Sequence, residues 1–98
     1  MIVFTPEAGQ QIRDLRQHYA ARDRPEAIRG LSAALEAAWQ KITTHPAIGL
    51  AAPRPYPHLA RPGLAWIKAG RYWIAYSSAK PVAIVGVFYE TANIPGRI

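Results

Sequence analysis

The side chains that could carry out acid–base or electrostatic chemistry gather in the carboxyl-terminal half of the chain. Cleavage of RNA without a metal needs a base, an acid for the leaving oxygen, and cations that balance the charge developing on the phosphate. The residues of suitable type are His58, Arg61, Lys68, Arg71, Tyr76, Tyr89, Glu90 and Arg97. Each also has a structural interpretation, as a half-buried sheet residue, a solvated charge or a loop histidine. Residue type alone therefore assigns no catalytic residue.

Metal and cofactor chemistry has little support in the sequence. His18, His45 and His58 share no ligand spacing, the carboxylates are scattered, and there is no cysteine. The chain also has no phosphate-binding glycine loop, nucleophile elbow or carboxylate pair. We therefore expect no metal site, no cofactor and no disulfide.

The net charge of +6 is unevenly distributed along the chain. Residues 1–50 hold six Lys/Arg and five Asp/Glu, a net charge of +1. Residues 51–98 hold six Lys/Arg and only Glu90, a net charge of +5. A basic surface suits an anionic partner, either a nucleic acid or an acidic protein segment. A surface that is basic only for solubility is the alternative.

Trp73 is the aromatic residue that stands out as a candidate contact. The alternation of residues 71–76 places Trp73 and Arg71 on one face of a strand, while the other face carries Tyr72, Ile74 and Tyr76. An exposed tryptophan beside an arginine is a common protein-binding anchor and can also stack on a base. The alternative is a Trp73 side chain packed beneath the loop or the tail.

A sheet must position these residues, and residues 70–89 predict its central hairpin. Residues 82–89 are apolar at every position, which suits a strand covered on both faces or lying centrally in a sheet. Residues 64–69 predict a further strand, and the β-branched and aromatic residues 2–4 predict a first one. Residues 90–98 are expected to leave the sheet.

Two amphipathic helices are predicted between the first and second strands. Thr5 is a suitable N-cap, Pro6 suits the first helical position, and the apolar spacing continues to about Arg22. A second helix is expected from a cap at Asp23, to which Glu26 would reach back, as far as residue 44. Because the turn between them is short, the helices should lie antiparallel.

The predicted fold class is α+β, with a helical hairpin on one face of a small, mostly antiparallel sheet in the order β-α-α-β-β-β. Five prolines lie between residues 46 and 62, so that segment should be a mainly irregular loop that is either functional or ordered by packing. Ninety-eight residues suit one domain, residues 1–98. The absence of a long apolar run favours a cytoplasmic protein.

In this order and spacing the chain resembles the RelE/ParE superfamily of type II toxins, most closely the ParE branch, whose members are also known as plasmid stabilisation proteins. The resemblance covers nearly the whole chain. It is carried by the segments Phe4-Thr5-Pro6-Glu7-Ala8, Asp14-Leu15, His45-Pro46-Ala47-Ile48-Gly49, Gly70-Arg71-Tyr72-Trp73-Ile74-Ala75-Tyr76, Ile84-Val85-Gly86-Val87-Phe88-Tyr89 and Asn93-Ile94-Pro95.

Two departures from the superfamily pattern bear on function. Trp73 stands where members commonly have an arginine, which RelE-type ribonucleases use to hold the scissile phosphate. Tyr89 and Ala92 stand where many members have a histidine and then an arginine. Arg71 and Arg97 lie nearby but match neither motif. The resemblance therefore favours a binding toxin over an enzyme.

The resemblance implies a toxin that inhibits DNA gyrase and is neutralised by a cognate antitoxin with an acidic, flexible segment, in a toxin–antitoxin hetero-oligomer. The alternatives are a ribosome-dependent messenger ribonuclease with a rearranged site and a non-toxic module that binds the antitoxin. Direct binding to nucleic acid is a weaker alternative. The expected surface contacts are Arg61, Lys68, Arg71, Trp73 and Arg97, with no catalytic residue assigned.

Overall fold

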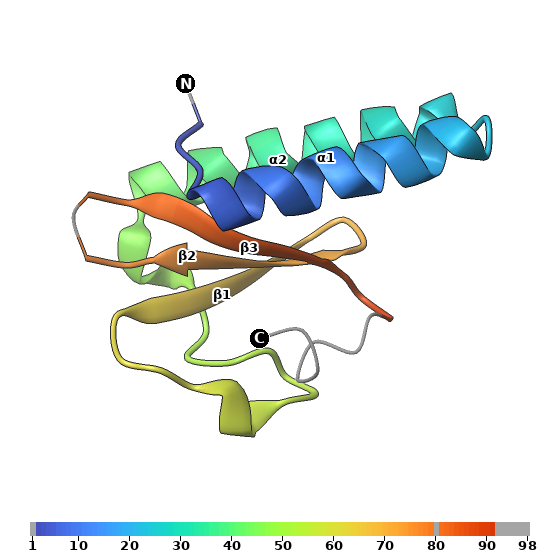
Figure 1. Cartoon of the computed structure of the whole chain (residues 1–98). Coiled ribbons are helices and arrows are strands. Elements are labelled where there is room, and N and C mark those ends of the chain that lie inside the picture. Colours follow the sequence, from blue (N-terminus) through green and yellow to red (C-terminus); the bar gives the residue numbers. More distant parts are fainter. Residues whose placement is uncertain (1, 80, 92–98) are drawn as a thin grey trace.

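The computed structural model describes residues 2–79 and 81–91, in which two helices cover one face of a three-stranded antiparallel sheet (Figure 1). The strands follow one another in space as they do in sequence. The elements are α1 (Pro6–Ala21), α2 (Pro25–Thr44), the short 3-10 helices η1 (Pro46–Ile48) and η2 (Pro57–Leu59), β1 (Leu64–Ala69), β2 (Tyr72–Ser77) and β3 (Ala83–Tyr89). The α+β fold predicted from the sequence is thus confirmed.

The predicted first strand, residues 2–4, is reduced to a single parallel bridge between Phe4 and Ile84. The Thr5 N–H donates to the Ile84 carbonyl at 3.0 Å, and the Ile84 N–H donates to the Val3 carbonyl at 2.9 Å. Helix α1 begins at Pro6, so the chain turns away before a longer ladder can form. The segment therefore lies beside β3 without being a full strand.

The start of α1 follows the predicted capping pattern. The Thr5 hydroxyl accepts a hydrogen bond from the Ala8 N–H at 3.2 Å, and Pro6 occupies the first turn, where its missing N–H costs no helical bond. Ala8 and Ile12 are buried against the sheet, and Leu15 and Tyr19 pack against the same core. The predicted apolar stripe of this helix is confirmed.

The junction between α1 and α2 differs from the prediction, because Asp23 does not cap α2. Asp23 instead adopts a left-handed conformation with φ of 51°, which asparagine and aspartate tolerate better than most residues. The Arg24 and Asp23 N–H groups donate back to the carbonyls of Tyr19 and Ala20, which is the Schellman ending of a helix. Residue 23 therefore completes α1, Arg24 precedes α2 without a side-chain cap, and Glu26 pairs with Arg24.

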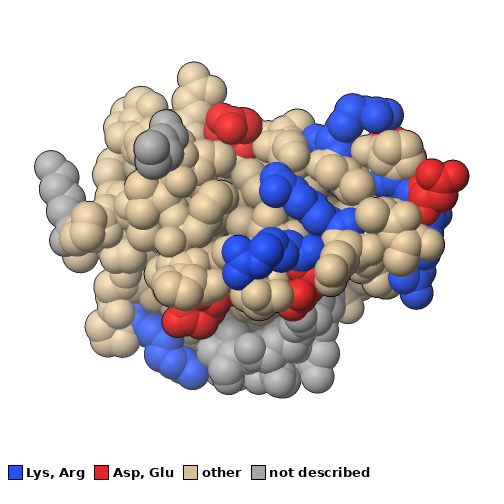
Figure 2. Space-filling model, turned by 45° about the horizontal axis from the view of Figure 1, so that its top comes forward, with Lys and Arg blue, Asp and Glu red and all other residues tan. Residues whose placement is uncertain are grey.

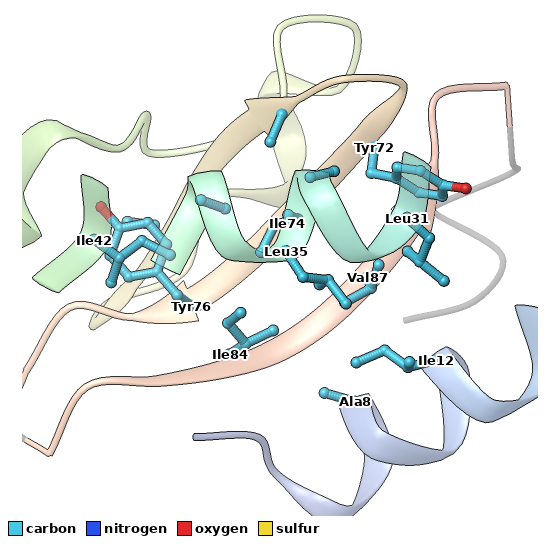
Figure 3. Close-up of a cluster of buried hydrophobic side chains, with 14 residues drawn as sticks. Ala8, Ile12, Leu31, Leu35, Ile42, Tyr72, Ile74, Tyr76, Ile84 and Val87 are labelled. Carbon is cyan, nitrogen blue, oxygen red and sulfur yellow. The ribbon is translucent and has the colours of Figure 1, made fainter. Parts of the chain in front are cut away.

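Two hydrophobic cores lie on opposite faces of the sheet. The helix-side core joins α1 and α2 to alternate sheet residues, among them Tyr72, Ile74 and Tyr76 (Figure 3). The loop-side core holds Trp73, Ala75 and their neighbours beneath the segment between α2 and β1. Its members are Leu59, Trp66, Trp73, Ala75 and Phe88, with Ala52, Tyr56, Leu64 and Val85 packed against them. Both faces of β2 are therefore covered. The alternating pattern predicted which residues lie on each face, but not that both faces would be covered.

A register shift in β3 explains why its apolar residues show no alternation. Ala75 pairs with Gly86, whereas the next residue of β2, Tyr76, pairs with Ile84. The extra residue is Val85, and such a bulge changes which face the following side chains take. Ile84 and Val87 therefore both reach the helix-side core despite their odd spacing.

The buried Tyr76 side chain ties the loop to the sheet. Its hydroxyl donates to the Pro46 carbonyl at 2.7 Å and accepts from the Gly49 N–H at 2.9 Å. Beside it, Leu50 and Trp66 exchange two backbone hydrogen bonds of 2.7 Å. The segment that follows α2 is therefore ordered by packing and hydrogen bonds, which was one of the two predicted alternatives.

Within the part of the chain that the structure describes, no helix is long and apolar enough to cross a membrane.

Candidate functional site

The residues predicted as surface contacts do not form one site. Lys68 and Arg71 lie at the turn between β1 and β2, where both pair with Glu90. Arg61 lies before the opposite end of β1, where its guanidinium donates to the carbonyls of His58 and Ala60. Arg97 is outside the described residues. Of the predicted cations that the structure describes, Lys68 and Arg71 are thus brought together and Arg61 lies apart from them.

Glu90 is the centre of this charged cluster. Its carboxylate lies 2.9 Å from Lys68 Nζ and 3.2 Å from Arg71 Nη1, and Arg71 Nη1 also lies 3.4 Å from the Tyr89 hydroxyl. The hydrogen bond from Lys68, reinforced by the charges of Lys68 and Arg71, holds the pKa of Glu90 below its ordinary value. The Arg71 side chain is nevertheless 72% exposed, so within residues 2–79 and 81–91 its guanidinium remains accessible to a partner.

Lys68→Met is expected to raise the pKa of Glu90 toward its ordinary value, since it removes the largest cause of the shift. The paired carboxylate stabilises the fold above its unfolded pKa, and this stabilisation is lost as the pH falls through the lower folded pKa. In Lys68→Met that acid loss should be smaller. NMR titration of the Glu90 side chain measures the shift, with Arg61→Met as a control that should leave it unchanged.

Trp73 corrects the expectation of an exposed aromatic anchor. It lies on the predicted face of β2, opposite Tyr72, but its exposed fraction is only 3%. The loop-side core surrounds it, and the Arg54 guanidinium lies 5.5 Å from its ring centroid. The alternation along β2 predicted the face of Trp73 correctly, but it could not predict that a loop distant in the sequence covers this face. Trp73 is therefore a core residue, which was the alternative interpretation.

The residues that a ribonuclease could use are kept apart in the structure. Tyr76 is fully buried and its hydroxyl is engaged on both sides. His58 lies in η2 on the loop side of the sheet, whereas Tyr89 packs against the helix-side core. Glu90 is paired with two cations. This arrangement offers no acid and base facing one phosphate among the described residues.

A groove of about 1000 Å³ lies between the helical hairpin and the end of the sheet. The hairpin extends beyond the sheet at the end where α1 joins α2, so its inner face overhangs the groove there (Figure 1). The groove is lined by Gln11, Asp14, Leu15, His18, Tyr19, Arg24, Glu26, Ala27, Gly30, Gly70, Arg71, Tyr72, Val87, Phe88 and Tyr89. Of the predicted contacts, it includes Arg71.

Three tyrosines give the groove an aromatic floor. The Tyr19 and Tyr72 hydroxyls lie 2.5 Å apart, and the Tyr72 and Tyr89 rings meet edge to face with centroids 5.6 Å apart. Burial, reinforced by the hydrogen bond with Tyr19, raises the pKa of Tyr72 well above its ordinary value. The Tyr72 hydroxyl therefore stays protonated at neutral pH and can donate or accept a hydrogen bond.

Exposed cations also gather on the helical hairpin, toward the end where its helices join (Figure 2). They are Arg13, Arg16, Arg22, Arg24 and Arg29, with acidic residues between them. The net charge of only +1 over residues 1–50 gave no indication that arginines gather at this end of the hairpin. The basic surface is therefore not confined to the sheet half of the chain.

A comparison with protein families identifies the chain. The model of a family described as the ParE toxin of the type II toxin–antitoxin system parDE matches residues 2–91. The chain belongs to this ParE toxin family. Its membership indicates the toxin component of a type II toxin–antitoxin system, as the sequence resemblance implied. A search of curated proteins gave no match.

The groove of this ParE family member was missed by the sequence analysis, although one signal pointed to it. Gly30 lies within α2, and Ala27 lies one turn before it on the same side. Both line the groove, and a Cβ atom built at Gly30 would meet no other atom within 4 Å. Small residues on the inner face of this amphipathic helix thus mark where the groove lies.

Gly30→Ala is expected to raise the free energy of unfolding by about 0.5–1 kcal/mol, because glycine costs this much within a helix and nothing obstructs the new methyl group. Thermal or denaturant unfolding measures the change. Gly9→Ala in α1, where the new methyl group would lie in ordinary contact with Arg13, provides a second helical comparison. A destabilised Gly30→Ala protein would contradict the open space described at this position.

Proposed function

We propose that this protein is a toxin that acts by binding and inhibiting a target protein, DNA gyrase, and that a cognate antitoxin neutralises it. The observation that carries the proposal is the match of the ParE family model to residues 2–91. ParE-type toxins, as the sequence resemblance implied, act on gyrase without cleaving RNA. The proposed antitoxin carries an acidic segment that folds onto the toxin surface.

The site geometry supports binding over cleavage. The Tyr76 side chain is fully buried, so its hydroxyl cannot reach a substrate. Trp73 stands where a RelE-type nuclease would use an arginine, and its side chain is also buried. The exposed cations Arg61, Lys68 and Arg71 remain the proposed contacts with an acidic partner, and Arg97 remains a prediction outside the described residues. Since Lys68 and Arg71 share one carboxylate, their cluster carries a net positive charge.

Inhibition of purified gyrase tests the target. Supercoiling of relaxed plasmid should fall as this protein is added in excess, and messages in a translation extract should stay intact. A variant with Lys68→Glu and Arg71→Glu should inhibit less if these cations contact the target, whereas Lys41→Glu on the far end of α2 serves as the charge control. Unchanged supercoiling together with codon-positioned cuts would replace this proposal by the ribonuclease alternative.

Growth measurements test neutralisation. Induction of the protein alone should arrest growth, and co-expression of a short acidic protein encoded beside it should restore growth and form a stable complex. Normal growth on induction alone would instead favour a non-toxic binding module.

A further inference from the structure

Three exposed arginines lie together on the outer side of the helical hairpin, and we call them the arginine ridge: Arg13 and Arg16 on α1 and Arg29 on α2. Arg13 and Arg16 are three residues apart, so they share one side of α1. The Arg16 guanidinium lies 3.5 Å from the Ser32 hydroxyl across the hairpin, and Arg29 shares a side of α2 with Ser32. Lysine and arginine side chains gather over this part of the molecule (Figure 2).

Most acidic residues of the hairpin lie away from this ridge. Asp14 and Glu26 line the groove beneath the hairpin, and Glu26 pairs with Arg24. No ridge arginine lines that groove, and within residues 2–79 and 81–91 none forms an ion pair with a carboxylate. Glu36, four residues after Ser32, is an acidic residue on the outer side of α2. The ridge therefore keeps a net positive charge on a surface separate from the groove.

The ridge charges give the fold no ion pair among the described residues. Arg13 donates to the side-chain oxygen of Gln10 at 2.9 Å, and Arg16 lies beside a hydroxyl, so both contacts are with neutral groups. Like charges three or four residues apart on a helix repel each other and destabilise it slightly. A gathering of cations that weakens the fold is typical of a surface whose charges meet an anionic partner.

The surroundings of the ridge favour phosphate groups over a protein surface. Protein interfaces centre on apolar or aromatic anchors, and single-stranded nucleic acids stack their bases on exposed aromatic rings. In the described part of the chain the large hydrophobic residues that stand exposed are Val3, Ile48 and Leu50, and none of them belongs to α1 or α2. The residues around the ridge are small or polar: Gln10, Gln17, Ala20, Ser32 and Ala33. Arginine forks bind phosphate oxygens, and amide and hydroxyl groups can donate to them as well.

The spacing of the ridge suits a duplex backbone. Arg13 and Arg16 are separated by about 4.5 Å along the helix axis, at about 1.5 Å per residue. Successive phosphates of one DNA strand are separated by about 3.4 Å along the duplex axis. The two arginines can therefore reach neighbouring phosphates, and Arg29 on the adjoining helix can reach a third. The outer side of the hairpin faces away from the sheet, so a duplex can approach it (Figure 1).

We propose that the arginine ridge binds the phosphate backbone of duplex DNA without reading its sequence. The inference goes beyond the proposed function and rests on it only for the choice of DNA over RNA, since gyrase acts on duplex DNA. The groove and the charged cluster around Glu90 lie on other surfaces, where protein partners can bind at the same time. Binding to DNA would raise the concentration of the toxin near a target that works on the same DNA.

The salt dependence of DNA binding tests the ridge. A labelled duplex of about twenty base pairs, roughly two helical turns, is titrated with the purified protein and followed by fluorescence anisotropy. Each phosphate contact contributes about −0.9 to the slope of log K against log salt concentration, so three contacts predict a slope of about −2.7 or steeper. Binding should then fall by roughly 40-fold or more between about 50 and 200 mM salt. Duplexes of unrelated sequence should bind alike.

Single substitutions locate the contacts. Arg13→Gln, Arg16→Gln and Arg29→Gln should each make the slope shallower by about 0.9. Lys41→Gln, near the end of α2, and Arg54→Gln, on the loop side of the sheet, remove the same charge elsewhere and should leave the slope unchanged. The ridge variants should melt at the same temperature as the parent protein or higher, because they relieve repulsion between like charges. Lost binding is thereby separated from lost folding.

A substitution of opposite sign gives an independent check. Glu36→Gln should tighten DNA binding by roughly two- to fivefold, the range of an exposed charge interaction, because it removes a negative charge beside the ridge. Glu7→Gln, at the start of α1, removes the same charge from another part of the hairpin and should leave DNA binding unchanged.

The proposal is overturned if no ridge variant changes the salt slope, or if Lys41→Gln and Arg54→Gln change it as much. Tighter binding to a duplex RNA of the same length would instead identify an RNA surface. Tighter binding to polyglutamate than to DNA would identify a surface for an acidic protein. DNA binding is measured without gyrase or antitoxin, so this proposal and the proposed function can fail separately.

Discussion

Trp73→Ala is expected to lower the free energy of unfolding by about 3–5 kcal/mol, the cost of truncating a large aromatic residue in a core. Trp73 is 3% exposed and forms the centre of the loop-side core with Trp66 and Phe88. The fall should appear as a decrease in melting temperature of about 4–8 °C for each kcal/mol in a domain of this size. Against a total stability of about 5–15 kcal/mol, this is a severe loss.

Two further substitutions separate burial from surface contact. Trp73→Phe keeps much of the buried area and should cost less than Trp73→Ala. Arg54→Ala removes only the cation above the ring and should cost about 0.5–1 kcal/mol. A stable Trp73→Ala protein that has lost only partner binding would contradict the core role and restore the exposed anchor.

Gly49→Ala is expected to destabilise the protein by about 2–4 kcal/mol, through overpacking and the loss of hydrogen bonds. The added methyl group would overlap the Tyr76 hydroxyl and lie 2.8 Å from Tyr76 Cε1 and 2.9 Å from Ala65 Cβ. The backbone of Gly49 is extended, with φ of −71°, so the substitution adds no backbone strain to these costs. Neither neighbour can move freely, since Tyr76 is fully buried and Ala65 lies in β1.

A double-mutant cycle checks this cause. Tyr76→Phe removes the hydroxyl and its bonds to Pro46 and Gly49, which should cost about 1–3 kcal/mol. In that background Gly49→Ala should cost less than it does alone, because the closest overlapping atom is gone. Strictly additive losses, measured by denaturant unfolding, would show that the overlap is not the cause.

Local patterns in the sequence predicted most of the elements. The Thr5 cap, the proline after it and the apolar spacing placed α1, and Pro46 placed the end of α2 at Thr44. These rules act over a few residues, within which the chain has few alternatives. The prediction that Asp23 caps α2 was wrong, because two local rules compete at this residue. An aspartate can cap the next helix or close the previous one, and three backbone bonds favoured closure.

Features that depend on distant segments could not be predicted in the same way. The period of β2 assigned Trp73 to a face, but only the path of the loop decides that Leu59 and Tyr56 cover it. The candidate groove likewise depends on how far the hairpin overhangs the sheet, which no short window of sequence encodes. Of the predicted contacts, Lys68 and Arg71 were the two brought together, because the tight turn between β1 and β2 holds them near each other.

The two cores share β2, so binding on one face of the sheet can change the stability of the opposite face. Residues of this strand alternate between the helix-side core and the loop-side core, so an opening that unfolds β2 exposes both of them. A ligand that binds only the folded state raises the free energy of every opening that destroys its site. A partner bound in the groove should therefore slow cleavage of the loop between α2 and β1 that proceeds through unfolding of β2, although this loop packs on the opposite face of the sheet.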